Sequence, residues 1–194
     1  MGAAIVLDLT QSAGVMELDV HALEPDFAVF PMYKWLLGPY SLAFLYAAPK
    51  WQHGIPLEEN GFNRSDDGYA IGALRYDMGE RDVFVAIPTG VAALNIVTSW
   101  TRASIEGRLQ YLTNTLADML VATGYTCVEE RFRSPHILGV KGVRDGLAAD
   151  CKRKGLYINQ RHDGLRISPH VFNTEADMEV CASILSELRE GLNQ

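Results

Sequence analysis

The sequence predicts an α/β fold in two parts. Residues 1–90 should form a mostly parallel sheet, and residues 91–194 a bridging helix with a small α+β domain. Three observations predict this fold. Continuous apolar runs of strand length fill the first part, which is typical of parallel strands covered on both faces. A long stretch with apolar residues at three- and four-residue steps then indicates helix. Shorter strand and helix patterns make up the remainder.

The first part contains three apolar runs, "AAIVLDL", "DFAVFP" and "SLAFLYAA", and each predicts a strand. Between the first two, "DVHALE" predicts one or two helical turns, and helical crossovers are usual between parallel strands. From Pro49 to Arg75 the sequence is polar and rich in glycine. This stretch predicts a loop long enough to have a function of its own.

The helical stripe joins the two parts. Pro88 suits the first position of a helix, and Gly124 suits the position just after a helix ends. Between them the pattern predicts one long helix or two in close succession. The apolar positions of the stripe are Val91, Leu94, Val97, Ile105, Leu109, Leu112, Leu116 and Leu120.

The segment after Gly124 predicts an α+β unit. Four strands are expected, in "YTCVEERF", "HILGVKGV", "GLYINQ" and "LRISP". A helix in "RDGLAADCKRKG" lies between the second and the third. The last helix should begin after Asn173 or Thr174, because either residue can cap it and acidic residues fill its first turn.

Composition excludes several classes of function. The 194 residues carry a formal net charge of −7, which argues against binding of nucleic acid. No run of 18 apolar residues exists, so no membrane span is expected, and the opening lacks the basic region of a signal peptide. We therefore expect a cytoplasmic protein. Its three distant cysteines fit neither a disulfide framework nor a zinc site, and no metal is expected.

Three polar residues follow two of the predicted strands. Asp8 ends the first strand, Gln11 lies in the turn after it, and Lys34 follows the second strand. Open α/β sheets place ligands at this edge. A carboxylate, an amide and an amine together suit pyridoxal 5′-phosphate, because an amine can form a Schiff base with its aldehyde and a carboxylate can keep its ring nitrogen protonated.

Two separated motifs resemble the class V aminotransferase family of fold-type I pyridoxal-phosphate enzymes. "DLTQSAGVMELDVHALEPDFAVFPMYKWLLGP" resembles the cofactor segment of that family, and "LRISPHVFNTEADME" is similar to its C-terminal motif. The resemblance implies that residues 1–90 are part of the large cofactor-binding domain and that 91–194 include the small domain. It also implies an aminotransferase, an epimerase or a lyase that acts on an amino acid or amine.

Residue by residue, the resemblance assigns four roles. Asp8 faces the pyridine nitrogen, Gln11 the phenolic oxygen, and Lys34 forms the Schiff base. Arg166 binds the carboxylate of an amino-acid-like substrate, a role that suits its planar pair of donors.

The chain departs from the family pattern at several places. Tyr33 stands where a smaller residue commonly touches the cofactor phosphate, and Asn63 is a looser candidate for the same region. "GPYSLAF" lacks two glycines of the family's loop. The cysteine desulfurase branch would carry a nucleophilic cysteine where this chain has "RHDG", so persulfide chemistry is disfavoured.

The resemblance covers only the C-terminal half of a family member. It also implies that the protein forms a homodimer. The chain is then either a fragment of an enzyme or a shortened relative that acts as a binding or dimerisation module. A hydrolase using Ser168 and His170 has little weight, because the sequence contains no G-x-S-x-G motif. The substrate and the reaction subtype stay open.

Overall fold

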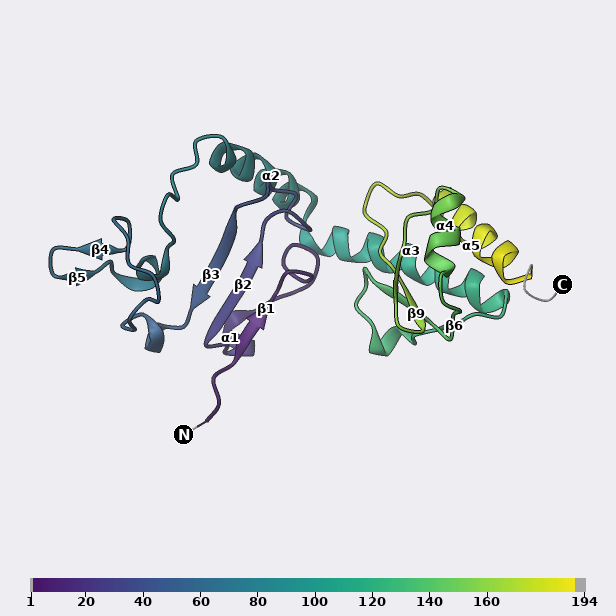
Figure 1. The fold of residues 1–194 in the computed structure, drawn as a ribbon, viewed down its shortest axis with the longest axis horizontal. Coiled ribbons are helices and arrows are strands. Elements are labelled where there is room, and N and C mark those ends of the chain that lie inside the picture. Colours follow the sequence, from purple (N-terminus) through teal and green to yellow (C-terminus); the bar gives the residue numbers. More distant parts are fainter. Residues whose placement is uncertain (1, 191–194) are drawn as a thin grey trace. The chain divides into compact units, whose positions relative to one another are not determined.

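The computed structural model describes residues 2–190, which form two compact units, one ending at Arg102 and the other beginning at Ala103 (Figure 1). The predicted division into residues 1–90 and 91–194 stays a prediction.

The first unit contains a three-stranded sheet of order β1-β2-β3. β1 (Val6–Asp8) runs parallel to β2 (Phe27–Pro31), and the short helix α1 (Val20–Leu23) lies in the connection between them. β3 (Ala43–Ala47) pairs with β2 in antiparallel fashion.

The expectation of a mostly parallel sheet was wrong. Only the β1–β2 pair is parallel, and every other strand pair in the described residues is antiparallel. The physical reason lies in the connection from β2 to β3. A parallel pair needs a crossover of about a dozen residues or more, usually helical. Here residues 32–42 contain no helix and close into a loop that returns beside β2, since the N–H of Met32 bonds to the carbonyl of Leu42 at 2.9 Å.

The remainder of the first unit is a long, mostly irregular segment and a helix. Its elements are η1 (Pro49–Trp51), β4 (Arg64–Ser65), β5 (Gly68–Tyr69), η2 (Gly72–Tyr76) and α2 (Ala86–Trp100). The predicted helical stripe thus forms two helices rather than one. α2 ends at Thr101, whose φ of +62° breaks the helical backbone, and α3 (Arg102–Ala122) follows. Gly124 has a φ of +85° and terminates α3 as predicted.

The second unit contains a four-stranded antiparallel sheet of order β6-β7-β9-β8. Its strands are β6 (Thr126–Cys127), β7 (Leu138–Lys141), β8 (Asn159–Arg161) and β9 (Gly164–Ile167). A short 3-10 turn, η3 (Glu130–Phe132), lies between β6 and β7. The two-residue turn His162–Asp163 joins β8 to β9, with His162 at a φ of +50°.

One face of this sheet is buried against helices. Alternate strand residues, namely Leu138, Val140, Leu165 and Ile167, belong to a core with side chains of α3, α4 (Leu147–Arg153) and α5 (Glu175–Glu190). Successive residues of a strand point to opposite faces. Gly139 and Arg166 therefore lie on the other face.

Asp26 holds the start of the first sheet together. Its carboxylate accepts hydrogen bonds from the N–H of Ile5 and the indole of Trp51, each at 2.7 Å, and forms an ion pair with Lys50. The hydrogen bonds from Lys50, Trp51 and Ile5, in that order, lower the pKa of Asp26 from its ordinary 3.8 to about 2.

A depressed carboxyl pKa makes the first unit sensitive to acid. Because the folded pKa is below the unfolded one, Asp26 stabilises the fold above about pH 3.8, and this contribution is lost as the pH falls towards 2. Urea unfolding followed by tryptophan fluorescence should show the loss, since all three tryptophans, at 35, 51 and 100, lie in this unit. Asp26→Asn should lower stability at neutral pH and flatten its pH dependence. Asp66→Asn, at an exposed turn, is the control, and an equal flattening in both variants would contradict the assignment.

Candidate active site

Asp8 lies at the carboxyl end of β1, and Lys34 lies just after the carboxyl end of the parallel neighbour β2. Asp8 is the last residue of β1, and its Oδ1 accepts the N–H of Thr10 at 2.9 Å. The pKa of Asp8 is lowered, mainly by hydrogen bonds from the side chain and backbone of Thr10 and further by the charge of Lys34. The carboxylate is therefore ionised at neutral pH and lies within the electrostatic influence of the lysine amine.

Gln11 is oriented by the residue that follows the lysine. The indole Nε1 of Trp35 donates to the Oε1 of Gln11 at 3.4 Å. This contact places the amide nitrogen of Gln11 on the opposite side, and within residues 2–190 no bond from that nitrogen is observed. A donor is thus available for an acceptor atom of a ligand. The sequence motif contains Trp35 next to Lys34, but its contact with Gln11 joins residues 24 apart and was not predicted.

A tightly closed loop presents Lys34. The N–H of Gly38 bonds to the carbonyl of Met32 at 2.8 Å, and that of Leu37 to the carbonyl of Lys34 at 3.0 Å. A Cβ atom at Gly38 would lie only 2.6 Å from the Cβ of Met32, so this position requires glycine. Lys34 itself is half-buried, with its Nζ 5.8 Å from the centre of the Tyr33 ring.

The turn after β1 packs directly on the lysine loop. Gly14 has a φ of +92°, and a Cβ atom there would lie 2.9 Å from the backbone oxygen of Trp35. The two halves of the N-terminal motif are therefore in contact, and the glycine allows their close approach. This explains why the motif contains glycine at that position.

Tyr33 stacks on Tyr40 with ring centres 4.6 Å apart and planes inclined by 16°. Both rings are exposed. Tyr33 is thus accessible beside Lys34, and its predicted contact with a cofactor phosphate stays a prediction.

Asn63 lies inside the long loop of the first unit, unlike the exposed Tyr33. This asparagine is fully buried, and its Nδ2 donates to the carbonyls of Glu58 at 2.7 Å and Asp77 at 3.3 Å. Its Oδ1 accepts the N–H of Asn60 at 2.9 Å. These bonds hold the long loop together, and they give Asn63 a structural role. The cofactor contact predicted for it stays a prediction that this geometry does not favour.

Arg166 lies in the second unit, in the middle of β9. It is paired in register with Gly139 of β7 and Asn159 of β8, on the sheet face away from the helices. The side chain is half-buried, and no hydrogen bond or ion pair of its guanidinium occurs among the described residues. A guanidinium in this state has its paired donors free for a carboxylate.

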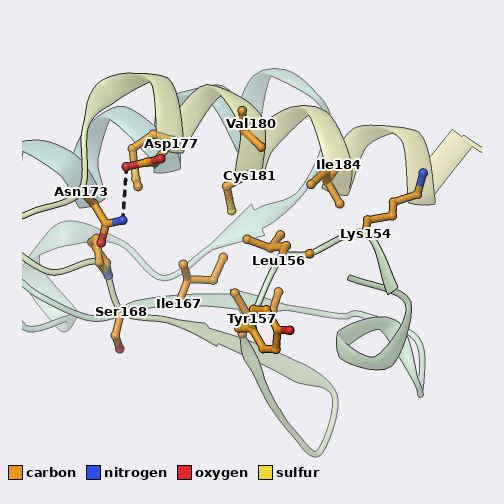
Figure 2. A pocket seen from close by; sticks show the side chains of 14 residues that line it. Lys154, Leu156, Tyr157, Ile167, Ser168, Asn173, Asp177, Val180, Cys181 and Ile184 are labelled. Carbon is orange, nitrogen blue, oxygen red and sulfur yellow. Dashed lines mark hydrogen bonds between the residues drawn. The ribbon is translucent and has the colours of Figure 1, made fainter. Parts of the chain in front are cut away.

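A pocket of about 310 Å³ lies elsewhere in the second unit, between α5 and the segment that precedes β8. Figure 2 shows it, with Val180, Cys181 and Ile184 of α5 on one side and Leu156 and Tyr157 opposite. None of the predicted site residues lines this pocket. The first unit therefore carries the predicted residues Asp8, Gln11 and Lys34, and Arg166 is a separate candidate in the second unit.

The sequence model of the family described as aminotransferase class-V matches residues 1–141. The chain belongs to this family. Both the lysine motif and the turn after β1 lie within the matched segment. Members of the class-V family use pyridoxal phosphate. The resemblance drawn from the two motifs is thereby confirmed.

Curated relatives of this class-V protein have different names. One from Methanothermobacter thermautotrophicus, named "Probable cysteine desulfurase", is 27% identical over 221 residues, covering 97% of this chain and 54% of that protein. Isopenicillin N epimerase of Amycolatopsis lactamdurans is 28% identical, with 96% and 53% covered. The chain spans about half the length of the curated relatives it matches.

Solved structures show the same fold. The apo cysteine desulfurase of Thermococcus onnurineus matches with a TM-score of 0.83 at 22% identity, over 97% of this chain and 53% of that one. Within residues 2–190, no helix is both long and apolar enough to cross a membrane. The same residues contain no cluster of side chains that could hold a metal ion.

The residues at the end of β1 fit pyridoxal phosphate. An ionised carboxylate, an amide with a free donor and a half-buried amine correspond in chemistry to the ring nitrogen, the phenolic oxygen and the aldehyde of that cofactor. Thr10 and Trp35, which orient two of these groups, were not predicted. In the sequence, Thr10 is adjacent to Gln11 and Trp35 is adjacent to Lys34, and this adjacency is the signal that could have identified them.

Proposed function

We propose that the protein takes part in a pyridoxal-phosphate-dependent transformation of an amino acid or amine, with Lys34 as the Schiff-base lysine. The observation that carries this proposal is the contact between the turn after β1, which bears Gln11, and the loop that presents Lys34. The contact is made through the Trp35–Gln11 hydrogen bond and the close approach at Gly14. When bound, the cofactor supplies an electron sink for the bonds at the substrate α-carbon.

Each side chain of the cluster has a definite task in this proposal. Asp8 would hold a proton on the ring nitrogen, because its lowered pKa keeps it anionic at neutral pH. Gln11 would donate from its amide nitrogen, which the bond from Trp35 leaves available. Lys34 would hold the cofactor through its aldehyde, and its amine would move a proton at the substrate α-carbon.

Arg166 would bind the substrate carboxylate through its two parallel donors. Its guanidinium is half-buried and has no acidic partner among the described residues. Partial burial strengthens such a pair, since water screens it less. The substrate is therefore an amino acid or amine-containing acid in this proposal, and the protein acts as a homodimer, as the family resemblance implies.

The cysteines argue against desulfurase chemistry in this chain. Cys151 and Cys181 are buried, and Cys127 is half-buried. Burial raises the pKa of all three thiols, that of Cys181 to about 12. A cysteine that takes up sulfur must be an accessible thiolate. Transamination, epimerisation or a lyase reaction without an enzyme cysteine therefore fits better.

The second candidate function is that of a catalytically incomplete chain, fragment or remnant, that acts as a binding or dimerisation module. It is kept beside the first because the chain spans about half the length of the curated relatives it matches. It predicts a stable, dimeric species by light scattering that has no affinity for the cofactor.

Addition of pyridoxal phosphate to the 194-residue chain separates the two candidates. We expect a new visible absorbance band and, after borohydride reduction, a stable label that peptide mapping by mass spectrometry finds on Lys34. A label on another lysine, or no label at all, would contradict the enzyme proposal. A dimer without the band would support the module.

A further inference from the structure

The outer face of the second sheet, opposite the helices, carries an unusual arrangement of charge. Two rows of four residues cross it, as the strand register shows. One row is Thr126, Lys141, Gly164 and Arg161, and the other is Val128, Gly139, Arg166 and Asn159. No acidic residue occupies any of these positions, although the chain carries a net charge of −7.

Three cations surround a glycine on this face. Arg161 pairs in register with Gly164, and Lys141 extends the β7–β9 register to the other side of the same glycine. Arg166 lies two residues further along β9. Diagonal neighbours of this kind on adjacent strands are about 7–8 Å apart. Arg161 and Lys141 are therefore both within reach of an anion that is bound at Arg166.

One glycine leaves space between these side chains. Gly164 has no side chain to cover the sheet between Lys141 and Arg161, and only backbone oxygens lie near the position of a Cβ there. A Cβ at Gly139 would lie 2.9 Å from the Cγ2 of Val128, so the Val128 side chain covers that glycine. Within the part of the chain that the structure describes, none of the three cations forms a hydrogen bond or an ion pair through its side chain. A set of cations that lacks acidic partners and encloses a bare patch of backbone is suited to an anionic ligand.

We infer that this face recognises a second acidic group, so that the substrate is an amino acid with an anionic side chain. The inference rests on the proposed function, in which Arg166 binds the α-carboxylate. Arg161 and Lys141 then bind the distal anion above Gly164. Two separated charges demand two separated cationic positions, and a monoanionic amino acid would leave Arg161 and Lys141 unused.

Binding of simple acids to the full chain tests the inference without the cofactor. Glutarate and valerate have the same number of carbon atoms, but glutarate carries two carboxylates and valerate one. At constant ionic strength, we expect calorimetry or NMR titration to give a glutarate Kd about fivefold lower, the value of one partly exposed ion pair of about 1 kcal/mol. The amide signals of Gly139 and Gly164 should shift.

Variants separate this site from general attraction by charge. Arg161→Gln should raise the glutarate Kd about fivefold, to near that of valerate, and Lys141→Gln should act in the same direction. Arg131→Gln removes the same charge from an exposed arginine that pairs with Glu129, and it should leave the Kd unchanged. Equal binding of the two acids, or equal losses in Arg161→Gln and Arg131→Gln, would overturn the inference.

The outcome is distinguishable from failure of the proposed function. A borohydride label on Lys34 without a preference for glutarate would overturn the inference alone. A preference for glutarate without any label would leave the anion site in place and contradict the enzyme proposal.

Discussion

Lys34→Ala should lose the borohydride-stable attachment of pyridoxal phosphate to background. Lys34 is half-buried and forms no ion pair among the described residues, although its charge contributes to the lowered pKa of Asp8. Because no acidic side chain pairs with its amine there, the amine is placed to react with an aldehyde. Any turnover on an added amino acid should fall by about 10²–10⁴-fold or more, because the lysine also moves a proton. Intact-mass spectrometry after reduction measures the attachment directly.

Lys152→Ala is the matched control for this experiment. Lys152 is exposed at the end of α4, with its Nζ 6.0 Å from the centre of the Tyr157 ring. Its removal should leave the label and its position unchanged. If Lys34→Ala kept a full equivalent of label while Lys152→Ala lost it, the assignment of the Schiff-base lysine would be wrong.

Gly14→Ala should destabilise the first unit by about 3 kcal/mol, because two costs add there. The first is backbone strain, since alanine disfavours the φ of +92° at this position. The second is overpacking, because the new methyl group would lie 2.9 Å from both the backbone oxygen of Trp35 and the Cδ2 of Leu36. Urea unfolding followed by tryptophan fluorescence measures the loss.

Gly61→Ala is the control within the same unit. No atom lies within 4 Å of the position that its Cβ would take, and its φ is not positive. We expect a change of less than about 0.5 kcal/mol, as is usual for surface substitutions. Equal destabilisation by both variants would show that the contact between the turn after β1 and the lysine loop contributes little.

The sequence located the ends of two neighbouring strands but not the direction of the third. Asp8 and Gln11 follow from the end of β1 and Lys34 follows β2, as a local rule about strand ends predicted, and their roles at a cofactor stay predictions. The direction of β3 depends on how residues 32–42 close, and apolar runs are the same for parallel and antiparallel neighbours. The continuous runs therefore suggested the wrong sheet.

Other features that the sequence left open have equally physical causes. Thr101 interrupts the helical stripe through its positive φ, and apolar spacing alone does not reveal backbone conformation. The burial of Asn63 comes from hydrogen bonds to Glu58 and Asp77, which depend on the path of a long loop. Polar loop residues look alike in a sequence whether they bind a ligand or the backbone.

The two-residue turn between β8 and β9 fixes which side chains of β8 lie on the outer face, so the anion binding proposed for that face would depend on loop length as well as on residue identity. Side chains alternate between the faces of a strand, so one inserted residue that shifted the pairing of β8 would move Arg161 from the open face towards the apolar core. An insertion or deletion here would thus weaken the proposed anion site while every arginine is retained. Sequence comparisons within the family should therefore compare the length of this turn before they compare its residues.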